Sequence, residues 1–100
     1  MSKFCFTLLS PPTSQERLLD LLLDAAADEV FTSVPAFSPG LSHGRLSSEE
    51  QVLGRSASTR FQIILTEQAM TDLLQRLQVE FRGAGLRYWA TALAVEGDIE

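Results

Sequence analysis

The pattern with the clearest chemical use in this chain is arginine next to glycine. Gly44-Arg45 and Gly54-Arg55 bracket a stretch rich in glycine and serine, and Arg60 follows it. A guanidinium group forms paired hydrogen bonds with phosphate or carboxylate, and an adjacent glycine lets backbone N–H groups approach the same anion. The pattern predicts either an anion-binding loop or a set of arginines that form salt bridges across a subunit interface.

Metal binding would have to use two other residues of this stretch, His43 and Glu50. His43 is the only histidine of the chain, and Cys5 is its only cysteine. A structural zinc site needs about four soft or borderline ligands, so the site could be completed only if several subunits shared it. The alternative is that His43 is a loop residue that is exposed to solvent or hydrogen-bonded.

The sequence predicts no catalytic centre. A nucleophile needs a base beside it, and the only histidine lies in the serine-rich stretch. The nucleophile elbow, the zinc-binding HExxH helix, the phosphate-binding Walker loop and the Rossmann glycine pattern are all missing from the sequence. We therefore expect a protein that is not an enzyme.

Four carboxylates recur at every fourth position of the first expected helix: Glu16, Asp20, Asp24 and Asp28. Residues at this spacing share one ridge of a helix, where like charges repel one another. The ridge is either a contact surface for a basic partner or cations, or simply a solvated helix face, with Arg17 pairing with Asp20.

The composition predicts a single globular domain over residues 1–100. The chain has a mass of 11.0 kDa, is 45% hydrophobic and 21% charged, and carries a net charge of −5, which disfavours binding to nucleic acid or to an anionic membrane. No stretch approaches the ~18 apolar residues of a membrane span. The start of the chain resembles a strand rather than a signal peptide, and a single cysteine suits a reducing compartment, so we expect a cytoplasmic protein.

Hydrophobic periodicity places the elements that would position these residues. Alternation predicts strands over residues 3–9, 30–37, 59–65 and 86–95, and helical spacing predicts helices over residues 14–27 and 67–81. The order strand, helix, strand, strand, helix, strand is that of the ferredoxin-like α+β sandwich, an antiparallel four-stranded sheet with both helices on one face. Pro35 lies inside the second strand, which predicts that this strand is at an edge of the sheet.

Helix ends and faces follow from local signals. Thr13 and Glu16 have capping-box spacing at the start of the first helix, Thr66 is expected to cap the second, and Gly83 and Gly85 are expected to end it. Asp72 and Arg76 are spaced for an ion pair on the solvated side of the second helix. The residues expected to face the core are Leu18, Leu21, Leu22, Ala25 and Ala26 in the first helix, and Met70, Leu73, Leu74, Leu77 and Phe81 in the second.

The sheet is predicted to have apolar residues on both faces. In the first strand Phe4, Phe6 and Leu8 would line one face, and Cys5 and Leu9 the other. A two-layer sandwich covers only one face with helices, so an apolar second face needs a further cover. We expect copies of the chain to associate; the alternative is a monomer whose loop or tail covers this face.

Several segments together resemble a family of small proteobacterial proteins of unknown function with a PII-like fold, relatives of PII signalling proteins and of the copper-tolerance protein CutA. These segments are Phe31-Thr32-Ser33, His43-Gly44, residues 50–55, Arg60-Phe61, residues 80–85 and Tyr88-Trp89. The resemblance covers nearly the whole chain. It implies a ferredoxin-like subunit that forms trimers, often encoded beside heavy-metal efflux systems of the resistance–nodulation–division type.

The same resemblance assigns roles to two loops. Residues 38–58 correspond to the T-loop of PII proteins, the segment that docks on partner proteins. Residues 82–87 correspond to the loop that helps PII proteins hold ATP between subunits; here it retains Gly83 and Gly85 but lacks the longer Gly–Lys pattern. The resemblance therefore identifies no cofactor.

Together with these residues, the resemblance implies a non-enzymatic, trimeric PII-like sensor or regulatory protein, an accessory to heavy-metal efflux. Its long loop would bind a small anionic ligand, a metal ion or a protein partner such as a transporter. The alternatives are a metal-binding chaperone or buffer of the CutA type, and a purely structural oligomeric module. The residues expected to bind ligand or partner are His43, Gly44, Arg45, Glu50, Gln51, Gly54, Arg55 and Arg60, with His43 and Glu50 as the metal donors.

Overall fold

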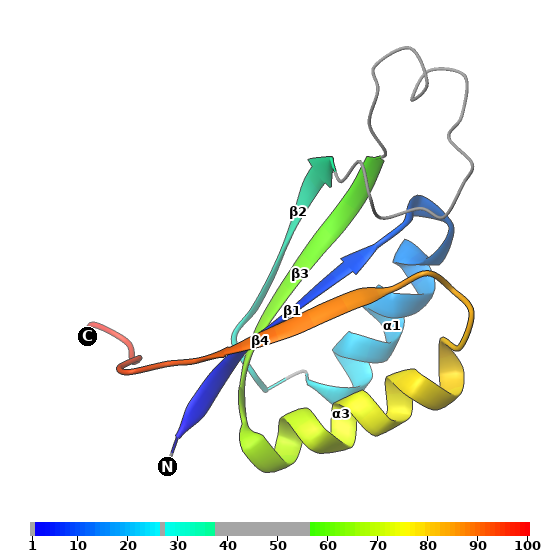
Figure 1. Ribbon diagram of the computed structural model, residues 1–100. Coiled ribbons are helices and arrows are strands. Elements are labelled where there is room, and N and C mark those ends of the chain that lie inside the picture. The colour runs from blue at the N-terminus through cyan, green and yellow to red at the C-terminus, as the bar shows by residue number, and fades with distance from the viewer. Residues whose placement is uncertain (1, 27, 38–56) are drawn as a thin grey trace.

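The computed structural model describes residues 2–26, 28–37 and 57–100. It is an α+β sandwich with a four-stranded antiparallel sheet in the order β2-β3-β1-β4, and both helices cover one face of the sheet (Figure 1). The predicted ferredoxin-like fold is confirmed. The elements in chain order are β1 (Lys3–Ser10), the short 3-10 helix η1 (Pro12–Ser14), α1 (Gln15–Ala25), β2 (Phe31–Phe37), β3 (Ala57–Thr66), α3 (Glu67–Glu80) and β4 (Arg87–Ala92).

Strand β2 lies at one edge of the sheet, as its proline predicted. Pro35 is aligned with Thr59 of β3 and has no strand on its other side among the described residues. Proline has no backbone N–H to donate to a second neighbour, so only an edge position accommodates it. Strand β4 forms the opposite edge and pairs with β1 alone within the described chain.

The core lies between the helices and the sheet face that they cover. Phe6 and Leu8 of β1 and Phe61 and Ile63 of β3 are at most 1% exposed, and Leu18 on α1 is fully buried against them. Leu21, Leu22, Leu73, Leu77 and Phe81 complete the helix side of this core. The predicted inward faces are therefore confirmed, except that Ala25 is exposed while Ala26 is buried, because the helix ends there and the chain turns.

The start of α1 differs from the prediction. Pro11 and Pro12 lead into a 3-10 turn, in which Ser14 N–H donates to the Pro11 carbonyl at 3.1 Å, and α1 begins only at Gln15. The fixed φ of proline favours such a turn, which places Thr13 inside it, so Thr13 and Glu16 form no capping box. At α3 the prediction is confirmed: the Thr66 hydroxyl accepts a hydrogen bond from Ala69 N–H at 3.2 Å.

The second face of the sheet is not covered by either helix, and we call it the open face. The strand alternation and register assign it these residues: Lys3, Cys5, Thr7, Leu9, Thr32, Val34, Ala36, Ser58, Arg60, Gln62, Ile64, Thr66, Arg87, Trp89 and Thr91. Trp89 is 45% exposed and Val34 37%. The face therefore mixes apolar with polar side chains, and it is less apolar than the first strand alone suggested.

Candidate ligand-binding groove

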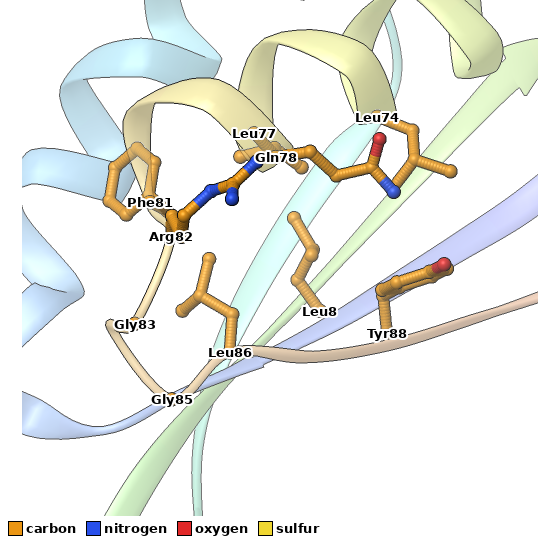
Figure 2. A pocket seen from close by; sticks show the side chains of 10 residues that line it. All are labelled: Leu8, Leu74, Leu77, Gln78, Phe81, Arg82, Gly83, Gly85, Leu86 and Tyr88. Carbon is orange, nitrogen blue, oxygen red and sulfur yellow. The ribbon is translucent and has the colours of Figure 1, made fainter.

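A groove of about 420 Å³ lies between the second half of α3 and strand β4, with Leu8 of β1 at its floor (Figure 2). Its lining residues are Leu8, Leu74, Leu77, Gln78, Phe81, Arg82, Gly83, Gly85, Leu86 and Tyr88.

Two glycines make the turn that closes one end of the groove. Gly83 and Gly85 have φ values of +79° and +80°, in the left-handed region that other L-residues rarely adopt. Ala84 N–H donates to the Phe81 carbonyl at 3.0 Å, which fixes the first part of the turn. The predicted helix stop is thus confirmed, and the turn directs Leu86 and Tyr88 toward α3 (Figure 2).

The floor of the groove is apolar and well packed. Leu77 is only 5% exposed and serves both the core and the groove. The ring of Tyr88 lies 5.8 Å from that of Phe6, measured between centroids, and remains 47% exposed. A flat apolar group could therefore lie on leucine side chains beside an aromatic ring.

The polar groups of the groove are the Arg82 guanidinium, the Gln78 amide and the Tyr88 hydroxyl. Arg82 is exposed and forms no ion pair with any described residue. Its charge is consequently available to an anionic group, with the amide and hydroxyl as further hydrogen-bond partners. None of the ten lining residues is a serine, cysteine, histidine or carboxylate.

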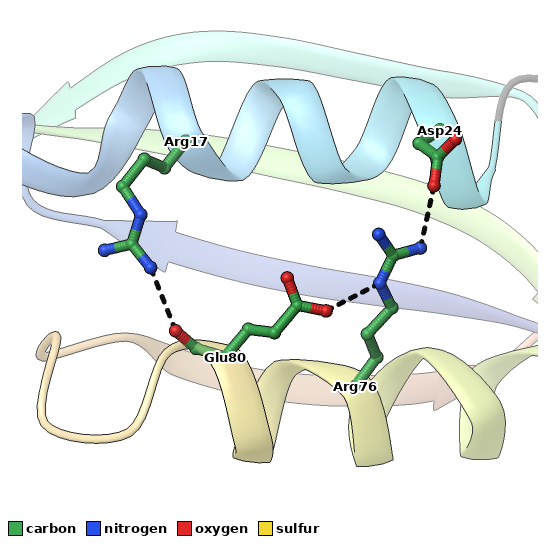
Figure 3. A network of polar contacts seen from close by, with 4 residues as sticks. All are labelled: Arg17, Asp24, Arg76 and Glu80. Carbon is green, nitrogen blue, oxygen red and sulfur yellow. Dashed lines mark hydrogen bonds and ion pairs between the residues drawn. The ribbon is translucent and has the colours of Figure 1, made fainter.

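A network of polar contacts holds the end of α3 against α1, next to the groove (Figure 3). Arg76 Nε donates to Glu80 Oε2 at 2.8 Å and Arg76 Nη1 to Asp24 Oδ2 at 3.0 Å. The hydrogen bond to Glu80, followed by that to Asp24, raises the pKa of Arg76. Arg17 Nη2 donates to the Glu80 carbonyl at 2.9 Å, and its guanidinium lies 4.6 Å from the centroid of Phe81.

This network corrects two predicted ion pairs. Arg76 bonds to Glu80 and Asp24 instead of Asp72, whose carboxylate accepts from the Gln68 amide. Arg17 reaches the end of α3 rather than Asp20, since the carbonyl of Glu80 and the ring of Phe81 lie across the helix interface. The acidic ridge of α1 therefore serves partly as an inter-helix contact.

Of the residues predicted to bind ligand or partner, Arg60 is the member that the structure describes. It is exposed on β3 and belongs to the open face, whereas the groove lies on the side of the sheet that the helices cover. The structure thus does not bring Arg60 into the groove. The remaining predicted residues, His43, Gly44, Arg45, Glu50, Gln51, Gly54 and Arg55, fall outside the described residues.

Metal ligands do not gather in the described part of the chain. Residues 2–26, 28–37 and 57–100 contain no group of three or more His, Cys, Asp or Glu side chains placed to hold a metal ion. Cys5 is half-buried in β1 as a free thiol. The proposed donors His43 and Glu50 lie outside these ranges.

Reasoning from residue types missed the groove, although the family resemblance pointed to residues 82–87, four of which line it. Leu74 and Leu77 have the helical spacing of core residues and were interpreted only as core. The available signal was the run from Arg82 to Gly85, in which an arginine adjoins two glycines just after a helix, as in the Gly–Arg pairs of the long loop. Only the position of β4 beyond the cover of α3 shows that these leucines line an opening.

The order of elements and the antiparallel sheet define a ferredoxin-fold protein. The chain belongs to the DUF3240 family, described as proteins of unknown function, whose family model matches residues 1–100. Among curated proteins, none matches this sequence.

Solved structures share the fold at low sequence identity. A DUF3240 family protein from Shewanella baltica has a TM-score of 0.68 at 15% identity, over 100% of this chain and 99% of that one. CPII from Thiomonas intermedia, solved with ADP, AMP and acetate, has a TM-score of 0.69 at 18% identity, over 96% and 89%. A protein from Thermus thermophilus assigned as a PII-like signalling protein has a TM-score of 0.64 at 22% identity, over 92% and 86%.

In the part of the chain that the structure describes, no helix is both long and apolar enough to span a bilayer.

Proposed function

We propose that this chain is a non-enzymatic PII-like regulatory subunit that binds a small anionic ligand in the groove between α3 and β4. The observation that carries the proposal is the exposed Arg82 guanidinium, which has no ion-pair partner among the described residues and stands beside an apolar groove of about 420 Å³. In a chain with a net charge of −5, a cation left without a carboxylate partner beside a groove favours an anionic ligand.

The ligand class that fits the groove is a flat ring carrying phosphate, such as an adenine nucleotide. The ring would lie on Leu74 and Leu86 near the exposed face of Tyr88, and the phosphate would meet Arg82 and the backbone N–H groups of the glycine turn. CPII, which shares the fold, was solved with ADP and AMP. That finding belongs to CPII and supports the choice of nucleotides as the first ligands to test.

The position of the groove explains how a bound ligand would influence the segment that contacts a partner protein. Arg87, just after the glycine turn, and Arg60, just after the long loop, are both aligned with Leu9 of β1. Their backbones are therefore about two strand spacings apart, roughly 10 Å. The glycine turn, Phe37 and Ala57 thus lie at one end of the sheet, so occupancy of the groove would bias the segment that follows Phe37 and docks on a partner.

The remaining parts of the proposal extend the family resemblance. The chain acts in the cytoplasm as a single domain and as a trimer, residues 38–58 correspond to the T-loop and contact a transporter partner, and the physiological setting is heavy-metal efflux. In this arrangement His43, Arg45, Glu50 and Arg55 contribute to partner or metal recognition. These assignments rest on the resemblance and on the shared fold.

Isothermal titration calorimetry with ADP and AMP tests the proposal. Arg82→Gln removes a charge-assisted hydrogen bond of about 1.5–3 kcal/mol, so the dissociation constant should rise about 10- to 100-fold. Arg87→Gln is the matched control, because it removes the same charge five residues later on the open face. Equal binding by both variants, or no binding of either nucleotide to the unmodified protein, would contradict a nucleotide site in this groove.

A further inference from the structure

A second cavity, of about 280 Å³, lies between α1 and α3, and we call it the inter-helix hollow. The four residues of the polar network in Figure 3 all line it: Arg17, Asp24, Arg76 and Glu80. Phe81 lines it as well, and among the described residues Phe81 is the one that the hollow shares with the groove. With only 6% of its surface exposed, Phe81 forms a common wall between the two cavities.

Arg17 contacts this wall from the side of the hollow. Its guanidinium carbon lies over the Phe81 ring, 4.6 Å from the ring centroid, which is a cation–π geometry. Its Nη2 donates to the Glu80 carbonyl at 2.9 Å (Figure 3). A planar guanidinium can make both contacts at once, because it stacks with its face and donates from its edge. Arg17 is therefore attached to two consecutive residues at the end of α3, although it does not line the groove itself.

The end of α3 has no cation of its own in its last turn. The last carbonyl groups of a helix lack intrahelical donors, and they form the negative end of the helix dipole. Phe81 N–H still donates to the Leu77 carbonyl at 2.8 Å, as in a helix, whereas the Glu80 carbonyl receives the side chain of Arg17. Helix α1 thus supplies both the positive charge and the donor that favour this helix end.

The position of Phe81 matters to the groove because the glycine turn starts from it. Ala84 N–H donates to the Phe81 carbonyl at 3.0 Å, and Arg82 lies between these two residues in the sequence. A displacement of Phe81 would therefore move the carbonyl on which the turn is built and, with it, the guanidinium that faces the ligand.

Arg76 lines the same hollow but has no such connection to the turn. It contacts the carboxylates of Glu80 and Asp24, which stand at the ends of exposed side chains. Neither a backbone carbonyl nor the Phe81 ring is among the partners recorded for Arg76 in the described residues. The two arginines therefore differ in what they hold: Arg76 links the surfaces of two helices, and Arg17 holds the residues from which the groove is built.

We infer that Arg17 is a positioning residue for the ligand groove: by stacking on Phe81 and donating to the Glu80 carbonyl, it fixes the end of α3 and the start of the glycine turn that carries Arg82. It acts through Phe81 and does not touch the ligand. The inference rests on the proposed ligand site and names a residue outside the groove that sets its affinity.

Calorimetric titration with ADP tests the inference, with Arg17→Met and Arg76→Met as a matched pair that removes the same charge from the same hollow. Arg17→Met should raise the dissociation constant about three- to tenfold, because an exposed cation–π contact and a cation at a helix C-terminus each contribute a factor of a few. Arg76→Met should stay within about twofold of the unmodified chain, since screening weakens a charge that makes no contact with the turn. Arg17→Lys keeps the charge without the planar fork and should still bind about threefold more weakly than the unmodified chain.

Amide hydrogen exchange, followed by NMR without ligand, gives a second readout. Ala84 N–H should exchange at least about threefold faster in Arg17→Met, because its acceptor on Phe81 is less firmly held, and at an unchanged rate in Arg76→Met. Ala69 N–H, bonded to the Thr66 hydroxyl at the other end of α3, is the internal reference and should exchange equally in all three proteins.

The outcomes separate the inference from the proposed function. If the Arg17 and Arg76 variants bind ADP equally well, or if Arg17→Lys binds as tightly as the unmodified chain, Arg17 does not position the groove, while the nucleotide site stands. If the unmodified chain binds no ADP, the proposed site fails, and the exchange of Ala84 N–H decides the role of Arg17 alone. Equal exchange of Ala84 N–H in all three proteins would overturn that role.

Discussion

Replacing Gly83 by alanine tests the turn that builds the groove. Gly83 has φ +79°, and a Cβ placed there would meet no atom within 4 Å. The substitution therefore makes the left-handed backbone conformation less favourable without creating a clash. An L-residue in the left-handed region costs about 1–2 kcal/mol, so the free energy of unfolding should fall by that amount. For a domain of this size, each 1 kcal/mol lowers Tm by about 4–8 °C.

Gly97→Ala is the matched control for this prediction. A Cβ at Gly97 also meets nothing within 4 Å, and Gly97 does not adopt a left-handed φ. The substitution should be neutral or stabilise the fold by up to about 1 kcal/mol, because alanine reduces the entropy of the unfolded chain. Urea unfolding at one fixed protein concentration measures the free energy of unfolding of both variants. Equal stability of the Gly83 and Gly97 variants would refute the left-handed turn.

Two further predictions follow from packing and capping. Leu77→Ala removes a side chain that is 5% exposed and should lower the free energy of unfolding by about 2–5 kcal/mol. The control Val79→Ala, at 78% exposure, should change the free energy of unfolding by less than about 0.5 kcal/mol. Equal losses of stability in the two variants would contradict a core at Leu77. Thr66→Ala removes the acceptor for Ala69 N–H and should lower the free energy of unfolding, measured with denaturant, by about 1 kcal/mol. Thr13→Ala should lower it little, because Thr13 lies in the 3-10 turn. A larger loss for Thr13→Ala than for Thr66→Ala would indicate that Thr13 does form the capping box.

The parts of the fold set by short-range patterns were predictable from the sequence. The spacing of Leu73, Leu77 and Phe81 indicates the buried side of α3, and Pro35 indicates an edge strand, because each pattern reflects a local constraint that the fold keeps. The start of α1 was not predictable from the Thr13–Glu16 spacing, since Pro12 imposes a different turn on the same residues.

The site was harder to predict because it depends on which elements become neighbours. Alternation alone places Phe61 inward and Arg60 outward, but only the register shows that Arg60 shares a row with Arg87 on the face opposite to the groove. The partners of Arg17 and Arg76 likewise lie across the interface between α1 and α3, whereas sequence spacing considers one helix at a time. The residues expected to bind in the long loop fall outside the described residues, so those assignments remain predictions.

If a nucleotide-like anion binds at the turn between α3 and β4, two-dimensional amide NMR of the unmodified protein, titrated with ADP, will locate it residue by residue. We predict that the largest shifts occur at Gly83, Gly85 and Tyr88 and that they disappear in Arg82→Gln. Shifts confined to other parts of the chain, or a spectrum that ADP leaves unchanged, would contradict the claim.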